Sequence, residues 1–263
     1  MSQEIFAAAI DEFAEFRDQI EKVDLFGIGE PLMDKLIYER IAYAKSKGLP
    51  SVAISTNADL MDREAASNLL DSKIDVVIFS IDGTDAATHE AIRINTNFDR
   101  IIENVEYVIK LRDSRNSPMR FVFRFIVQDS NRHQWTEFRD HWRNKIDSGR
   151  GDLVIGYDVQ NWGGGVGANI ADLPTVPDEL PCHHIFDRMI VLRDGTVPLC
   201  CADVHEPELD LGNINDSSAL EVYNGQRFQE IREMHLNGRR NDLRICRECT
   251  ILNSELAQAV LTK

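Results

Sequence analysis

The sequence predicts an α/β fold built on parallel strands, followed by a smaller, cysteine-rich module. Up to about residue 160, short runs of Val, Ile and Phe alternate with amphipathic stretches, as strands and their connecting helices do in parallel sheets. All five cysteines lie in the last third of the chain. A partial barrel and an open doubly wound sheet both fit these repeats, and both bind ligands beyond the C-terminal ends of their strands.

Five segments have the composition of strands that are buried on both faces. These predicted strands cover residues 23–26, 52–55, 76–81, 121–127 and 153–157.

Helices are predicted in the intervals between these strands. Apolar residues recur at helical spacing along residues 5–20 and again along 98–109, which indicates helix faces packed on a core. A third helix over 34–47 begins with an acid and ends with lysines before Gly48 and Pro50, which is the expected start-and-stop chemistry.

A domain boundary is predicted near residue 165, where Trp162 is followed by a run of glycines and then by several prolines. The predicted domains are a partial barrel over 1–165 and a small module over 166–263. Within the module, Asp194-Gly195 predicts a hairpin turn between 189–193 and 196–200. Two helices are expected near 217–236 and 249–261.

Composition excludes several classes of protein. With 43% hydrophobic and 28% charged residues, the chain is not disordered, collagen-like or a disulfide scaffold. The net charge of -15 disfavours binding to nucleic acid or to anionic membranes. No apolar run reaches the roughly 18 residues of a membrane span, and the N-terminus carries acids where a secretory signal needs cations. We therefore expect a cytoplasmic protein without a nucleic-acid or membrane partner.

The cysteines predict a metal site. Cys246 and Cys249 form a CxxC pair, and a hairpin ending at Cys200 could bring that residue near Cys182. Four thiolates suit either zinc or an iron-sulfur cluster, and their spacing does not separate these two. A redox-active CxxC or four unrelated buried cysteines are weaker alternatives, because the cysteines cluster so strongly. Cys201 follows Cys200 along a predicted strand and should point to the opposite face, which favours a packing role.

Three further motifs each follow a predicted strand, and together they carry a resemblance. They are the LFGIGEPL segment at 25–32, Ser55-Thr56-Asn57, and the SIDG segment at 80–83, with Ile92-Arg93 beyond them. In this order they resemble the radical S-adenosylmethionine (radical SAM) family. The cysteines, with the CCAD segment at 200–203 and LGN at 211–213, resemble the auxiliary SPASM or twitch module of such enzymes. The resemblance covers nearly the whole chain and implies a partial radical SAM barrel without its first strand, followed by that module.

The resemblance also implies cofactors and the residues that bind them. The implied cofactors are S-adenosylmethionine and one auxiliary 4Fe-4S cluster, the latter held by Cys182, Cys200, Cys246 and Cys249. The residues with an implied role toward S-adenosylmethionine are Gly29, Glu30 and Pro31 for its amino group, Ser55, Asn57, Ser80 and Asp82 for its ribose and methionine ends, and Arg93 for its carboxylate. Ser55-Thr56-Asn57 could instead cap a helix, and Asp82-Gly83 could simply turn the chain.

The sequence departs from the family pattern in one decisive respect. The family holds its reactive 4Fe-4S cluster with a CxxxCxxC loop, and Cys182 is the first cysteine of this sequence. Ile28 and Ala58 also replace glycines that are usual in the family. We therefore expect an N-terminally shortened protein that binds the auxiliary cluster. Full-length relatives abstract a hydrogen atom from a substrate, and this chain alone is expected to be inactive.

Two other functions remain open at the sequence level. A noncatalytic zinc- or cluster-binding subunit could complete its barrel against a partner, because the strand at 23–26 would be an unpaired sheet edge. A metal-independent enzyme could use His183, His184 or His205 for proton transfer, although histidines beside cysteine ligands usually have supporting roles. The substrate, a small molecule or a peptide, is not specified. Asn161, Trp162 and the glycine run could line its pocket or form a hinge.

Overall fold

The computed structural model describes residues 1–165, 176–177, 179–205, 207–253 and 255. Contacts group the chain into two compact units, Phe13–Asp158 and Met1–Glu12 with Val159–Lys263, and we describe each by itself. The domain boundary predicted near residue 165 stays a prediction. The first of the two contact-based units ends at Asp158.

The first unit is built on a five-stranded sheet whose strands are all parallel and follow sequence order. The strands are β1 (Val23–Asp24), β2 (Val52–Thr56), β3 (Val76–Ser80), β4 (Arg120–Val127) and β5 (Leu153–Asp158). All five predicted strands are confirmed, with β1 shorter than expected.

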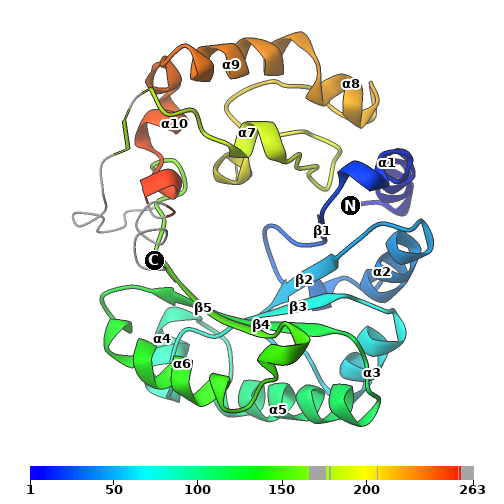
Figure 1. Cartoon of the computed structure of the whole chain (residues 1–263), viewed down its shortest axis with the longest axis vertical. Helices are drawn as coiled ribbons and strands as arrows, with labels where there is room; N and C mark the ends of the chain where they lie inside the picture. The colour runs from blue at the N-terminus through cyan, green and yellow to red at the C-terminus, as the bar shows by residue number, and fades with distance from the viewer. Residues whose placement is uncertain (166–175, 178, 206, 254, 256–263) are drawn as a thin grey trace. The chain divides into compact units, whose positions relative to one another are not determined.

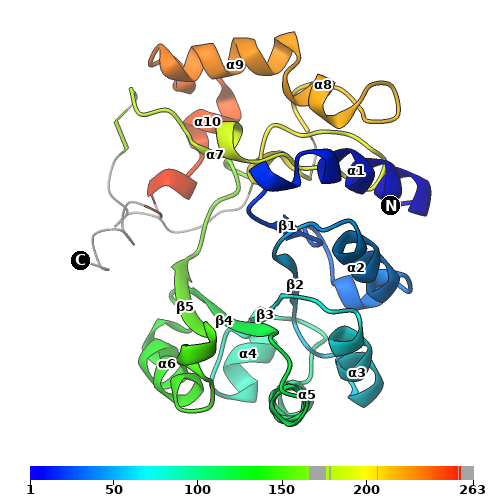
Figure 2. The ribbon, with the colours of Figure 1, turned by 45° about the vertical axis from the view of Figure 1, so that its right-hand side comes forward.

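The helices of this unit lie together on one side of the curved sheet (Figures 1 and 2). They are α2 (Ile37–Ser46), α3 (Arg63–Asp71), α4 (Ala86–Ile92), α5 (Phe98–Ser114) and α6 (Trp135–Arg143), with short 3-10 turns at Arg17–Gln19, Pro31–Met33, Arg132–Gln134 and Ser148–Arg150. A doubly wound sheet would reverse its strand order and carry helices on both faces. The sheet is therefore of the partial-barrel type.

Strand β4 shows how the core is built. Its residues alternate between buried and half-buried, so that Phe121, Phe123 and Phe125 all point to the helix-covered side. Phe123 stacks on Trp142 of α6 with ring centroids 4.2 Å apart, and Phe79 of β3 lies 5.1 Å from Phe123. This aromatic layer leaves the other face of the strands free for polar side chains.

The second unit contains short helices around a separate core. Its helices are α7 (His184–Asp187), α8 (Ala219–Tyr223), α9 (Gln226–Leu236) and α10 (Arg244–Glu248), with 3-10 turns at Cys201–Asp203 and Arg240–Asp242. Their core includes Ile185, Val197, Leu199 and Phe228. The helix expected over 217–236 is divided at Asn224-Gly225, since Gly225 caps α9. The helix expected over 249–261 falls largely outside the described residues.

The expected hairpin between 189–193 and 196–200 does not form a two-stranded ladder. Asp194-Gly195 does turn the chain, with Gly195 at φ +89°. The two arms share one backbone hydrogen bond, from the Leu192 amide to the Thr196 carbonyl at 2.8 Å. Residues beyond the turn otherwise pair with a later segment: the Val197 amide donates to the Gly212 carbonyl at 3.0 Å, and the Ile214 amide to the Gly195 carbonyl at 2.9 Å. The turn signal was correct, but the pairing partner lies further along the chain.

Helix α1 (Gln3–Glu15) contributes its first residues to the second unit. The Glu12 carboxylate accepts hydrogen bonds from the amides of Ala219 at 2.7 Å and Leu220 at 2.8 Å, which are the first residues of α8. An acid at a helix N-terminus satisfies orphan amides and complements the helix dipole.

Within the described part of the chain, no helix combines the length and apolar character needed to cross a membrane.

Candidate functional site

The predicted cysteine ligands meet at one pocket of the second unit. Cys182, Cys200, Cys246 and Cys249 all line it, together with His184, His235, Arg240 and apolar side chains such as Ile185 and Ile245. The four cysteines come from three separate segments: Cys182 lies two residues before α7, Cys200 lies just before the 3-10 turn at Cys201–Asp203, and Cys246 and Cys249 lie in and just after α10. All are free thiols and partly buried.

The environment of these thiols opposes their ionisation. Burial raises the pKa of Cys182 to about 11 and that of Cys246 to about 12, and the nearby cysteines raise both further. Burial also raises the pKa of Cys249. The pKa of Cys200 is raised by a hydrogen bond with Cys201 and by burial. Thiolates would repel one another in this apolar pocket, so the four thiols are poor acids when no cation is present. They become thiolates when a cation shares them, as in zinc and iron-sulfur sites.

Two further side chains, His235 and Arg240, complete the pocket wall, and no sequence motif indicated either of them. His235 of α9 accepts a hydrogen bond on Nδ1 from the Cys182 amide at 3.2 Å, and its Nε2 lies 3.6 Å from Cys246 Sγ. Burial lowers the pKa of His235 to about 4, so the ring is neutral. Arg240 contributes positive charge beside the thiols. Charge and hydrogen bonds around metal-bound sulfur tune such centres.

The predicted placement of Cys201 on the opposite face of a strand is wrong. Cys200 is extended, but Cys201 begins a 3-10 turn, so strand alternation does not apply. The pKa of Cys201 is lowered to about 5 by a hydrogen bond with Cys200 and by a further one with His184. Burial opposes this shift. Cys201 therefore contacts both a predicted ligand and the histidine beside the pocket.

The segment around the glycine run packs on the CxxC turn. Asn161 and Thr250 bond reciprocally, the Asn161 amide donating to Thr250 Oγ1 at 3.0 Å and the Thr250 amide to Asn161 Oδ1 at 3.1 Å. A Cβ on Gly163 would lie 2.6 Å from Ile245 Cγ1, and Gly163 has φ +64°. Glycine is thus required here for close approach to α10. Trp162 lies beside His205, with ring centroids 5.9 Å apart.

A second polar site lies at the C-terminal ends of the strands in the first unit. Glu30 holds the loop after β1 against the end of β2: its carboxylate accepts from Thr56 Oγ1 at 2.7 Å, the Asn57 amide at 2.8 Å and the Leu32 amide at 3.1 Å. Pro31 starts the following 3-10 turn. Gly29 is exposed with φ +94°, and nothing lies within 4 Å of where its Cβ would be. The Glu30 side chain therefore anchors the loop and leaves the Gly29 backbone free for a ligand.

Asp82 and Arg93 bind each other. The Asp82 carboxylate is buried and accepts from Arg93 Nε at 2.8 Å and from the Ile126 amide at 2.7 Å. Gly83 of the same motif touches α4, because a Cβ there would lie 2.8 Å from the His89 amide nitrogen. Asn57 Oδ1 accepts from the Asp59 amide at 3.0 Å and turns the chain. These contacts of Asn57, Asp82, Gly83 and Arg93 thus hold the chain in place at the strand ends.

Ser55 and Ser80 share a hydrogen-bond donor, Arg124, that no sequence motif indicated. Their hydroxyls lie 3.2 Å apart on neighbouring strands, and Arg124 Nη2 of β4 donates to them at 2.7 and 2.8 Å. Arg124 Nε is buried without a hydrogen-bond partner among the described residues. The alternation of apolar and polar residues along 120–127 was a usable signal, because it puts Arg124 opposite the phenylalanines.

The comparisons with known proteins match both parts of the chain. Residues 1–127 match the model of the radical SAM superfamily, and residues 182–250 match that of SPASM, an iron-sulfur cluster-binding domain. Two curated relatives are similar to about half of the chain: an AdoMet-dependent heme synthase of Nitratidesulfovibrio vulgaris, 32% identical over 123 residues, and an Fe-coproporphyrin III synthase of Methanosarcina barkeri, 32% identical over 131 residues. These alignments cover 46% and 50% of this chain, and 32% and 30% of the relatives.

Solved structures share the fold. The complex of BtrN with AdoMet and 2-DOIA superposes with a TM-score of 0.60 at 14% identity, covering 95% of this chain and 80% of that one. SuiB of Streptococcus suis superposes with a TM-score of 0.53 at 14% identity, covering 93% and 65%. At such identities the likeness concerns architecture alone.

The fold is that of an α/β protein with a separate thiol pocket. The chain carries a radical SAM domain over residues 1–127 and a SPASM domain over residues 182–250, and the cofactors of these two domains are S-adenosylmethionine and a 4Fe-4S cluster. The CxxC pair and the two upstream cysteines, Cys182 and Cys200, fall inside the SPASM match. The motifs at 25–32, 55–57 and 80–83 fall inside the radical SAM match.

Proposed function

We propose that this chain binds one auxiliary 4Fe-4S cluster through Cys182, Cys200, Cys246 and Cys249. The observation that carries this proposal is their convergence on one pocket from three segments of the chain. The donor set fits: four soft thiolates complete a cubane, and Arg240 offsets their negative charge. Such a cluster, with a thiolate on each iron, would supply one-electron chemistry.

The chain's own residues then have distinct tasks. The apolar wall, including Ile185 and Ile245, keeps water from the sulfurs. His235 holds the backbone of Cys182 in place from one ring nitrogen and contacts Cys246 with the other. The reciprocal Asn161–Thr250 bonds hold the residue that follows Cys249.

At the strand ends of the first unit, we propose a binding face for S-adenosylmethionine. The exposed Gly29 backbone carbonyl would accept a hydrogen bond from its amino group, and Glu30 and Pro31 would fix the loop that presents it. Ser55, Ser80 and Arg124 offer hydroxyls and positive charge toward polar ends of the ligand, and Asn57, Asp82 and Arg93 would shape and hold that face.

We further propose that these 263 residues do not by themselves cleave S-adenosylmethionine, because Cys182 is their first cysteine and the reductive step needs a three-cysteine cluster. Anaerobic incubation with dithionite and S-adenosylmethionine should give no 5′-deoxyadenosine above a protein-free control. Turnover would contradict this part of the proposal.

A noncatalytic partner subunit is the second candidate function. The observation that favours it is the edge position of β1, which pairs only with β2 among the described strands. An open edge can pair with another chain. A location in the cytoplasm is proposed with either function, since free thiols persist in reducing compartments.

The deciding measurement is iron, acid-labile sulfide and zinc per chain after anaerobic purification. About four iron and four sulfide per chain would support the cluster. About one zinc without sulfide, reproduced under iron-replete expression, would overturn it and favour a structural zinc site in a partner subunit.

A further inference from the structure

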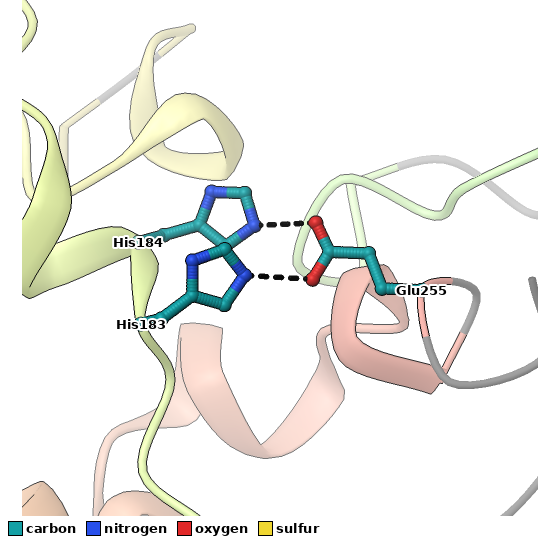
Figure 3. A group of neighbouring side chains, drawn as sticks. All are labelled: His183, His184 and Glu255. Atoms are coloured by element: carbon teal, nitrogen blue, oxygen red, sulfur yellow. Dashed lines mark hydrogen bonds and ion pairs between the residues drawn. The ribbon is translucent and has the colours of Figure 1, made fainter. Parts of the chain in front are cut away.

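A group of metal-binding side chains lies beside the cysteine pocket, outside the predicted ligand set. His183 and His184 begin α7, and Glu255 lies far along the chain. His183 Nε2 is 2.9 Å from one Glu255 oxygen, and His184 Nε2 is 2.9 Å from the other (Figure 3). One ligand atom from each of the three residues lies within 4.8 Å of the others.

The hydrogen bonds of His183 point to a cation at its Nε2. Its Nδ1 is 2.6 Å from Asp187 Oδ2, so a carboxylate oxygen faces each ring nitrogen. Ionised carboxylates only accept hydrogen bonds, and a neutral imidazole has a single N–H to donate, so a cation at Nε2 would give both carboxylates a partner. A histidine that ligates through one nitrogen and donates from the other to a carboxylate is the usual arrangement at metal sites.

The neighbouring ring strengthens this argument. The imidazole centroids of His183 and His184 are only 4.3 Å apart, and both rings face the one carboxylate of Glu255. The two imidazoles and the carboxylate thus converge on one place, where a single divalent ion could be shared by all three. His184 is buried, whereas His183 and Glu255 are about half exposed, so the group has a buried side and a side open to solvent.

We propose that His183 Nε2, His184 Nε2 and the Glu255 carboxylate form a mononuclear site for a divalent transition metal. Two imidazoles and one carboxylate suit Zn²⁺ or Fe²⁺. Three protein ligands leave a position for water or an oxygen donor on the solvent side. Asp187 positions His183, and Arg188 donates to Asp187 at 2.8 Å. His184 also lines the cysteine pocket, so the metal would lie next to the thiols but bind through nitrogen and oxygen.

The test uses the full chain after anaerobic cluster reconstitution, so that the cysteines are occupied before Zn²⁺ is added. Equilibrium dialysis against buffered Zn²⁺ should give about one additional zinc per chain. His183→Ala and Glu255→Gln should each weaken this binding at least about tenfold, and Asp187→Asn by about 10- to 100-fold. The exposed His133→Ala removes an imidazole from the other unit and should leave the binding unchanged.

Each other outcome overturns the site. Absence of additional zinc in the wild type, or equal binding in all variants, would mean that the group is an ion-paired cluster only. Loss of the visible cluster absorbance in His183→Ala would mean that the residue supports the cluster instead.

If no cluster forms, Co²⁺ distinguishes the two kinds of donor in the same chain. Co²⁺ that is bound by nitrogen and oxygen ligands lacks the intense near-ultraviolet absorption bands of Co²⁺ that is bound by thiolates. A bound Co²⁺ without those bands, lost in Glu255→Gln, supports the site even if the proposed cluster fails. Thiolate bands that persist unchanged in Glu255→Gln, with no further Co²⁺ bound, contradict it.

Discussion

Adjacent cysteines at 200 and 201 occupy different environments, and that difference follows from one change of backbone conformation. Cys200 is extended and lines the pocket, whereas Cys201 starts a 3-10 turn and contacts His184. Because a turn replaces the strand, neither residue's role follows from alternation along the chain.

Substituting these two cysteines separately tests the ligand assignment. Cys200→Ala should remove most of the visible absorbance of the reconstituted protein, because loss of one of four thiolate ligands weakens the binding of the cluster. Cys201→Ala should keep that absorbance. Absorbance spectra with iron and sulfide content provide the measurement, and equal losses in both variants would refute the assignment.

His89 gives the first unit a pH-dependent stability. Its ring is fully buried against α5, where burial and then the charge of Arg93 hold its pKa below the ordinary 6.5. The unfolded chain therefore binds a proton more readily than the folded chain. The free energy of unfolding contributed by this group is present above the unfolded pKa and falls as the pH drops below about 6.5.

Denaturant titrations of wild type and His89→Asn, from neutral pH to about pH 5, test this expectation. The loss of stability on acidification should be smaller in the variant. His133→Asn, at an exposed position, should retain the wild-type dependence. The expectation fails if wild type and His89→Asn lose stability in parallel.

At the scale of elements, Glu12 of α1 completes the N-terminus of α8. A five-residue helix has little intrinsic stability, so its amides depend on partners: the Ser218 capping box on one side and the Glu12 carboxylate on the other. Charge-assisted bonds to helix amides are stronger than neutral ones.

Glu12→Ala should therefore destabilise the second unit by about 1–2 kcal/mol. Hydrogen exchange of residues 219–223 should accelerate in this variant. Glu15→Ala, an exposed position of the same helix, serves as the matched control. Unchanged exchange in Glu12→Ala would show that the capping box alone holds α8.

The elements that sequence patterns predicted well are those whose pattern repeats. Runs of Val, Ile and Phe located all the strands, and an apolar stripe located α5 (Phe98–Ser114). The 194–195 turn was recognised, but its pairing with 211–214 depends on tertiary contacts. The thiol pocket could be predicted because only a few residues carry that chemistry. His235 and Arg124 could not, since their role depends on which segments pack beside them.

At the scale of the whole molecule, the two units have different sources of stability. The sheet unit has an aromatic core with members such as Phe123 and Trp142, whereas the second unit is built from short helices around the thiols. Where a metal centre joins several short segments, its binding energy is folding energy.

Removing the cluster anaerobically with a chelator should therefore loosen the second unit selectively. Hydrogen exchange should increase at residues 182–205 and 240–250 and stay unchanged in β2 to β4. The measurement is exchange followed by mass spectrometry on loaded and stripped protein. Uniform acceleration in both units would contradict independent stabilisation.

The division of the chain also sets an order of events during synthesis. The sheet unit is one continuous stretch, Phe13–Asp158, and can collapse while the ribosome is still elongating the chain. The other unit joins the opening helix to residues made much later, through Glu12 and α8. Its thiol pocket stays incomplete until Cys249 has left the exit tunnel. A complete set of four thiols is therefore available for iron and sulfide only after α10 has emerged, and a nascent chain arrested before α10 should have a folded sheet unit and an incomplete thiol pocket.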